Sequence, residues 1–206
     1  MGLTRNALAF TYVNMEDIKS RIIAAARALH FERGPDAVTM RAVAERVGVT
    51  ATALYRHFAD KDAILREVTG EGSRLLGSHL FRALEAPTAI ERLRATADAY
   101  LEFALAQPQA YRALFEPGAG GAEESPLHRQ RAAVRRFLRD RVREGMDAGV
   151  LAEGDPDGMA LSLWAMLHGL ASFHFAGITR AEGLSQRALT NLIEGIAAFE
   201  GVSAVK

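Results

Sequence analysis

Apolar residues recur at steps of three and four along almost the whole chain, and this spacing restricts the fold more than any other feature. From about Glu16 to Arg33 it places one apolar face on a helix, made of Ile18, Ile22, Ala25, Ala26 and Leu29. No segment shows the sustained alternation of apolar and polar residues that is typical of a strand. The pattern therefore predicts an all-α protein of about nine helices, the last over about 185–200.

Composition removes several classes of function. Lys plus Arg and Asp plus Glu both number 25, so only local clustering can favour a charged partner. Cysteine is absent, which excludes disulfides and thiolate metal ligands, and no apolar run approaches the ~20 residues of a membrane span. His168 and His174 are six apart and do not share a helix face well. We expect a cytoplasmic protein with no membrane partner, no metal and no cofactor.

The stretch from Thr39 to Asp62, "TMRAVAERVGVTATALYRHFADKD", indicates two short helices separated at Gly48-Val49. Thr39 suits the N-cap of the first helix, and Asp60 suits the cap of a longer helix that follows. A helix, a tight turn and a second helix form a helix-turn-helix, whose second helix enters the major groove of DNA. An alternative is a helical hairpin in an ordinary α domain, with Leu54, Tyr55 and Phe58 simply in the core.

A longer segment, "GPDAVTMRAVAERVGVTATALYRHFADKDAIL", resembles the DNA-binding domain of TetR-family (tetracycline-repressor-like) transcriptional regulators, with a match over about residues 16–68. The resemblance implies a three-helix DNA-binding domain, set here at 15–62, and a domain at 63–206 that binds an effector and dimerises. Residues 1–14 are expected to be a flexible arm. The segment "WAMLHGL" resembles the Trp-x-x-x-His-Gly signature of a subgroup of the family.

Roles carried over from the family give the predicted DNA contacts. Arg41 matches a position that often reaches a base, and Ala53 departs from the family because Ser or Thr there often contacts phosphate. Small side chains at the start of the second helix let its backbone approach the groove. The predicted contacts are Thr39 to phosphate, Arg41 to a base, Thr50, Ala51 and Thr52 opening the recognition helix, and Tyr55, His57 and Lys61 to phosphates.

The second domain is expected to hold the effector and the dimer interface. An apolar or aromatic effector is predicted to be lined by Tyr100, Phe103, Leu114, Phe137, Trp164, His168 and Phe173, although most of these residues suit a plain core equally well. The last two helices are predicted to dimerise through Trp164, Leu189, Leu192, Ile193 and Ile196. Seven arginines between Arg129 and Arg143 suggest a solvated helix face rather than a second nucleic-acid patch.

These features favour a homodimeric regulator that binds an inverted-repeat operator in double-stranded DNA and is a repressor released by the effector. No nucleophile motif, phosphate-binding loop or credible carboxylate pair indicates an enzyme. Two alternatives stay open: an α-helical ligand-binding or enzymatic domain with a purely structural helix-turn-helix, and a regulator controlled by a partner protein. The sequence does not separate a repressor from an activator.

Overall fold

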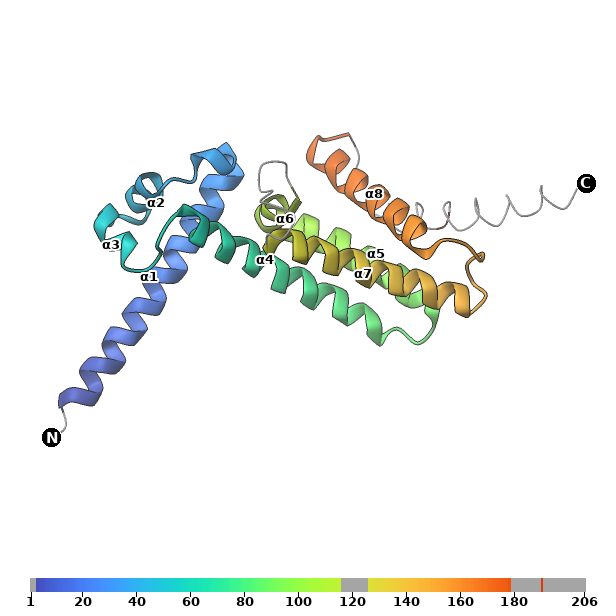
Figure 1. Cartoon of the computed structure of the whole chain (residues 1–206), viewed down its shortest axis with the longest axis horizontal. Helices are drawn as coiled ribbons and strands as arrows, with labels where there is room; N and C mark the ends of the chain where they lie inside the picture. The colour runs from blue at the N-terminus through green and yellow to red at the C-terminus, as the bar shows by residue number, and fades with distance from the viewer. Residues whose placement is uncertain (1–2, 116–125, 179–189, 191–206) are drawn as a thin grey trace, which may run out of the picture. The chain divides into compact units, whose positions relative to one another are not determined.

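The protein is all-α in the computed structural model, which describes residues 3–115, 126–178 and 190. In these ranges there are no strands, and short 3-10 turns cover Pro35–Ala37 and Ala83–Glu85. The all-α prediction is confirmed, and the helix expected over 185–200 lies outside the described residues except at position 190. The α-helices are α1 Leu3–Arg33, α2 Met40–Val47, α3 Ala51–Tyr55, α4 Lys61–Arg82, α5 Ala89–Ala106, α6 Pro108–Phe115, α7 Pro126–Asp147 and α8 Pro156–Phe175 (Figure 1).

Helix α1 is longer than the sequence pattern predicted. Helix α1 begins at Leu3 and not near Glu16, so the flexible arm expected over 1–14 is helical from Leu3 onward. No Gly or Pro lies between Leu3 and Arg33, so no residue of the segment interrupts the helix. None of the helices in the described part of the chain is both long and apolar enough to cross a membrane.

The chain divides into two compact units. The first comprises Met1–Ser73 with Gln109–Leu127, and the second comprises Arg74–Pro108 with His128–Lys206. The unit that contains the helix-turn-helix is therefore wider than the domain set at 15–62, because it also takes in the first half of α4 and nearly all of α6. Helix α4 is continuous and has residues in both units.

An apolar core holds the first unit together. Its fully buried members include Ile22 of α1, Val43 of α2, Leu54 of α3 and Ile64 of α4. Helix α6 contributes Ala113, and its Arg112 donates a hydrogen bond of 3.3 Å to the carbonyl of Phe31 at the end of α1. The three short elements α2, α3 and α6 thus share one core with the longer α1 and α4.

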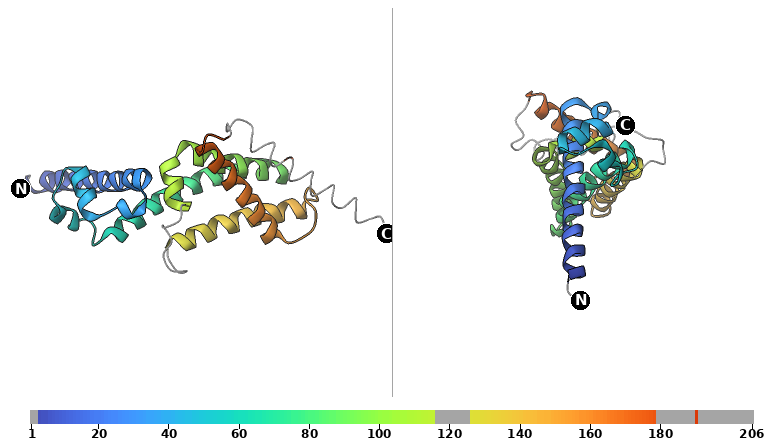
Figure 2. Two further views of the ribbon diagram at one scale, coloured as in Figure 1. Left: turned by 90° about the horizontal axis from the view of Figure 1, so that it is seen from above. Right: turned by 90° about the vertical axis from the view of Figure 1, so that its left-hand side faces the viewer.

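The second unit is built from the end of α4 together with α5, α7 and α8 (Figures 1 and 2). Helix α5 begins at a capping box, in which Thr88 and Glu91 exchange hydrogen bonds. Arg92 of α5 donates to Glu144 of α7 at 2.7 Å, and Arg135 of α7 pairs with Asp157 of α8 at 3.2 Å. The buried residues Tyr100, Phe103, Leu138, Leu163 and Leu167 form the centre of the unit.

Candidate DNA-binding surface and effector site

Local hydrogen bonds shape the turn between α2 and α3. The Thr39 hydroxyl accepts from the Ala42 N–H at 3.1 Å, and the Thr50 hydroxyl accepts from the Ala53 N–H at the same distance. Between these caps, Gly48 has φ 78° and ψ 34°, a left-handed conformation that glycine adopts without steric cost. Its N–H and that of Val49 both bond back to the Ala44 carbonyl at 3.0 Å, which closes α2.

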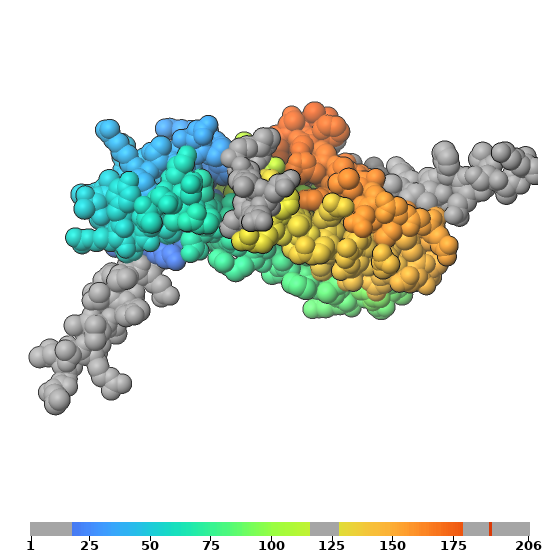
Figure 3. All heavy atoms as spheres, viewed as in Figure 1, coloured from blue at the N-terminus to red at the C-terminus, as the bar shows by residue number. Residues whose placement is uncertain are grey.

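Helix α3 has a buried side and an exposed side. Leu54 is fully buried and Phe58 is 4% exposed, so these residues anchor the helix in the core of the first unit. Tyr55 is 56% exposed, which argues against its place in the core under the hairpin alternative. Of the predicted DNA contacts, His57 is partly buried, whereas the exposed ones are Thr39, Arg41, Thr50, Ala51, Thr52, Tyr55 and Lys61. The segment that contains them, 39–61, is coloured blue to cyan in Figure 3.

The cations around this surface differ in whether an acidic side chain holds them in place. Arg46 is held by Glu32 of α1 through two hydrogen bonds of 2.6 Å, and these bonds lower the pKa of the Glu32 carboxyl. Arg41 and Lys61 are exposed at the starts of α2 and α4. Arg56 was not among the predicted contacts, yet it is exposed at the end of α3, where its position directly after Tyr55 was the available signal.

A polar cluster lies among the helices of the second unit. The Trp164 Nε1–H of α8 donates to the Tyr100 hydroxyl of α5 at 3.1 Å, and that hydroxyl lies 3.5 Å from His168 Nδ1. Tyr100 is fully buried, and Trp164 and His168 are partly buried. Burial, together with the positive charge of Arg131 on α7, lowers the pKa of His168 below its ordinary value of 6.5. The structure therefore brings together three residues of the predicted effector pocket.

The other four predicted pocket residues differ in their burial and in their neighbours. Phe103 is buried with its ring edge-on to His79, and Phe137 is partly buried against Phe81. Phe173 is 50% exposed, so it does not lie on an inward face as expected. Leu114 is buried in α6 and belongs to the first unit. Helical spacing alone does not separate a pocket wall from a core or a surface, which explains the mixed outcome.

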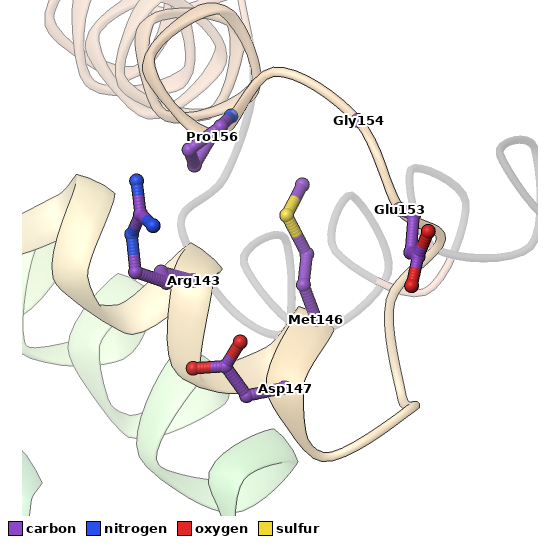
Figure 4. A pocket seen from close by; sticks show the side chains of 6 residues that line it. All are labelled: Arg143, Met146, Asp147, Glu153, Gly154 and Pro156. Atoms are coloured by element: carbon purple, nitrogen blue, oxygen red, sulfur yellow. The ribbon is translucent and has the colours of Figure 1, made fainter.

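A surface pocket of about 380 Å³ occurs where α7 ends and α8 begins (Figure 4). It is lined by Arg143, Met146, Asp147, Glu153, Gly154 and Pro156, none of which belongs to the predicted effector set. Both signs of charge face this pocket, and Met146 supplies apolar surface between them (Figure 4). Its lining therefore does not match the apolar or aromatic site expected for the effector.

Three of the arginines of helix α7 form ion pairs with acidic side chains. Arg135 pairs with Asp157, Arg139 with Asp140 and Arg141 with Glu144, at 3.0–3.2 Å. Arg136 and Arg143 are exposed. This arrangement favours the interpretation of a solvated helix face. Arg131 is partly buried, and this burial lowers the pKa of its guanidinium.

The predicted dimer interface is described only in part. Trp164 is partly buried, and Leu189, Leu192, Ile193 and Ile196 lie outside the described residues. Helix α8 nevertheless exposes three large apolar side chains, with Leu161 52%, Phe173 50% and Phe175 42% exposed.

Comparisons with known proteins agree with this organisation. Residues 22–68 match the family described as "Bacterial regulatory proteins, tetR family", and residues 93–196 match the "Tetracyclin repressor-like, C-terminal domain". The HTH-type transcriptional activator FasR of Mycolicibacterium smegmatis is 31% identical over 102 residues, which span 49% of this chain and 47% of that protein. The chain thus aligns with about half the length of this relative.

Solved structures share the fold over most of the chain. The TetR family transcriptional regulator PfmR of Thermus thermophilus is 27% identical with a TM-score of 0.72, over 84% of this chain and 96% of that one. AibR, solved with isovaleryl coenzyme A and operator DNA, is 18% identical with a TM-score of 0.71, over 87% and 97%. The resemblance of "WAMLHGL" to the Trp-His-Gly subgroup stays a prediction, since the matched C-terminal family has the general description.

Members of this family are non-enzymatic, so the prediction that the chain is not an enzyme is confirmed by its relationship and not by the absence of a motif. With a match to the C-terminal family that covers half of the sequence and a second match over the helix-turn-helix, the chain belongs to the TetR family of ligand-responsive, DNA-binding transcriptional regulators.

Proposed function

We propose that the protein is a homodimeric repressor that binds an inverted-repeat operator through α3 and is released by a small apolar or aromatic ligand. The observation that carries this proposal is the two-sided character of α3. Leu54 fixes the helix to an apolar core, while Thr50, Ala51 and Thr52 at its start are exposed and small. Such a helix start can approach the floor of the major groove closely.

The polar residues of this surface are proposed to contact either bases or phosphates. Arg41 reads a base, since an arginine side chain can donate two hydrogen bonds to guanine. The two threonines offer hydroxyl and methyl groups to base edges, although the Thr50 oxygen also caps α3. Tyr55, His57 and Lys61 contact phosphates and set the register on the duplex. With few direct base contacts, part of the specificity comes from DNA shape.

The homodimer is proposed from the apolar side chains that α8 exposes. Leu161 and Phe175 lie fourteen positions apart, close to four helical turns, so they share one side of α8, and they are 52% and 42% exposed. A closed two-fold interface is the commonest way for a chain to cover such a face, and it would place two copies of α3 on half-sites about one helical turn apart, roughly 34–36 Å. Double substitution of Leu161 and Phe175 by Glu should give monomers in light scattering, and an unchanged dimer mass would contradict the role of α8.

The ligand is proposed to bind in the second unit, near Tyr100, Trp164 and His168. An apolar portion in the ligand is supported by AibR, which was solved with isovaleryl coenzyme A, whose acyl group is apolar, and by a second relative described as a ketosteroid transcriptional regulator. Helix α4 can transmit a conformational change from the ligand site to the DNA-binding surface, because it begins at Lys61 and continues without a break into the second unit. The proposed place of action is the cytoplasm.

Activation is a second candidate outcome, and one observation favours it. The relative FasR is described as a transcriptional activator. A promoter fused to a reporter gene separates the two outcomes, because deletion of a repressor raises expression and deletion of an activator lowers it. We expect expression to rise.

DNA binding is tested with genomic fragments selected by the purified protein and then measured by fluorescence anisotropy over a range of salt. We expect the selected fragments to share a symmetric motif. Lys61→Ala should weaken binding to all of them alike and lower the salt slope by about 1. Arg41→Ala should instead relax the preference at one base position, by roughly 1–3 kcal/mol.

Arg136→Ala is the matched control, since it removes an exposed arginine from α7, outside the helix-turn-helix. It should leave affinity and salt slope unchanged. If the selected fragments share no symmetric motif, the proposal that a dimer binds an inverted repeat is contradicted. If Lys61→Ala and Arg136→Ala weaken DNA binding equally, the affinity reflects overall charge alone.

A further inference from the structure

The peptide group that joins Val47 to Gly48 begins the turn between α2 and α3, and both of its polar atoms are hydrogen-bonded. Its N–H donates to the carbonyl of Ala44, within α2, at 3.0 Å. Its carbonyl accepts from Nη2 of Arg21 at 2.8 Å, and this arginine lies on α1, 26 positions earlier in the chain. The peptide group is therefore bonded both to the helix that it ends and to a second helix of the same unit.

The orientation of this peptide group decides how the chain enters α3. Glycine adopts positive and negative φ about equally readily, so the φ of 78° at Gly48 is not imposed by the sterics of that residue. Val47 is 6% exposed, and its packing in the core restrains the side chain rather than the carbonyl. Thr50, the N-cap of α3, follows Gly48 by two positions. A rotation of the peptide group would therefore change the direction in which α3 leaves the turn.

A second link between α1 and α2 acts on side chains alone. Arg46 of α2 donates two hydrogen bonds of 2.6 Å to Glu32 of α1, and both residues are exposed. Such a pair joins two long side chains in water and contributes little to stability. Arg21 differs because it bonds directly to the backbone at the start of the turn. Of these two links, the one from Arg21 restrains the direction of α3.

We propose that Arg21 is a positioning residue for DNA recognition, which holds the Val47 carbonyl and thereby the direction of α3 without contacting DNA. The proposal rests on the proposed function in one respect, namely that α3 is the helix that reads the operator. A turn that fluctuates presents α3 correctly for only a fraction of the time, and the apparent affinity for operator falls by that fraction. Random DNA is bound mainly through charge near phosphates, which depends much less on the direction of α3.

The experiment measures the affinity of the full-length protein for operator and for random DNA of equal length, by anisotropy over a range of salt. The operator is the symmetric fragment that the wild type selects. Arg21→Gln should weaken operator binding roughly 5- to 50-fold, the range that corresponds to one hydrogen bond from a charged donor. The salt slope at operator should be unchanged, because no phosphate contact is lost. An Arg21→Gln protein that prefers operator as strongly as the wild type does would overturn the proposal.

Arg27→Gln is the matched control, because it makes the same change on α1, where the partner of Arg27 is Glu71 of α4 at 3.3 Å. It should keep the wild-type preference for operator, and its affinity for random DNA should equal that of Arg21→Gln. Equal losses of operator affinity in the two variants would show that charge alone matters and would contradict the positioning role. A salt slope lowered by about 1 in Arg21→Gln alone would assign Arg21 to a phosphate contact, which also contradicts it.

Amide hydrogen exchange in the segment 46–54 tests the turn in the absence of DNA. Exchange should be faster in Arg21→Gln than in the wild type and in Arg27→Gln. Arg21→Lys keeps a charged donor and takes the place of Arg21→Gln if that variant does not fold. In every variant at Arg21, exchange in the turn and preference for operator must change together or stay together at the wild-type values. A variant in which one of the two changes without the other would be incompatible with the proposal.

The wild type separates a failure of this proposal from a failure of the proposed function. A wild-type protein that selects no symmetric motif contradicts the proposed function and removes the basis of the positioning role. A wild-type protein that selects such a motif, with Arg21→Gln equally selective, contradicts the positioning role alone.

Discussion

The helix-turn-helix surface and the Tyr100 cluster place their polar groups in opposite ways. Around α3 the polar side chains are exposed, and the residues beneath them, such as Leu54 and Val43, are apolar and buried. In the second unit the hydroxyl of fully buried Tyr100 lies inside, bonded to Trp164. An exposed polar surface suits a large, hydrated, charged partner such as DNA, whereas a polar group within apolar walls suits a small ligand.

Because of this difference, substitutions should affect stability and binding separately in the first unit and together in the second. In the first unit, most of the proposed DNA contacts, such as Arg41, Tyr55 and Lys61, are exposed side chains outside the core, so they can be removed without loss of core packing. In the second unit the residues proposed to bind the ligand also contribute to the fold, because an inward polar group left without its partner is destabilising. The predictions below use this difference.

The largest effect is expected for Leu54→Ala compared with Tyr55→Ala. Leu54 is fully buried, so its truncation should lower the free energy of unfolding by about 2–5 kcal/mol. Tyr55 is 56% exposed, and its loss should change stability by less than about 0.5 kcal/mol while it weakens operator binding. Urea unfolding and anisotropy measure the two quantities. Similar losses of stability in both variants would contradict the two-sided description of α3.

Tyr100→Phe should destabilise the second unit by roughly 1–3 kcal/mol, because the Trp164 N–H loses its acceptor in a partly buried place. Tyr55→Phe is the matched control and should be close to neutral, since its hydroxyl is lost from an exposed side chain. Thermal unfolding followed by circular dichroism measures both. A Tyr100→Phe protein as stable as wild type would show that the buried hydrogen bond contributes nothing.

Two glycines should respond with opposite sign to substitution by alanine. Gly48→Ala should cost about 1–2 kcal/mol, because φ at this position is 78°. Gly77 lies within α4 with no atom near the position of an added Cβ, so Gly77→Ala should stabilise the protein by about 0.5–1 kcal/mol. Equilibrium unfolding in urea compares the two variants. A stabilising Gly48→Ala would be incompatible with the left-handed turn between α2 and α3.

The smallest effect concerns Glu32, whose pair with Arg46 joins α1 to α2. The hydrogen bond from Arg46 lowers the folded-state pKa of Glu32 below the ordinary 4.5. Ionised Glu32 therefore contributes stability above about this pH, and the contribution is lost as the pH falls through the lowered folded-state value. Both groups are exposed, so the contribution is small. The difference in Tm between wild type and Glu32→Gln should shrink as the pH is lowered. A difference that grows would contradict a stabilising role of the ionised Glu32 carboxylate.

Much of the first unit could be predicted because its determinants are local. Thr39, Gly48 and Asp60 each act on backbone atoms within a few residues, so their types and spacing were sufficient to predict two of the caps and the turn. The cap that Thr50 provides for α3 was not predicted. The start of α1 at Leu3 was not predicted, because the apolar pattern that was used to place this helix begins only at Ile18. In the second unit, Trp164 and Tyr100 are 64 positions apart, and helical spacing showed that each suits an inward face but not that they meet. The place of Leu114 in the first unit depends on packing of α6 that no local pattern encodes.

The most direct test of the account compares the affinity of an effector for free protein and for operator-bound protein, with Trp164 fluorescence as the signal. The ligand is the apolar or aromatic compound that releases operator most strongly from the full-length protein. If ligand and DNA are coupled, operator must weaken the ligand by the same factor by which the ligand weakens operator, typically about 5- to 150-fold. We predict a loss of affinity in that range when operator is present. Equal affinities with and without operator would show that the ligand does not control DNA binding, whichever residues it contacts.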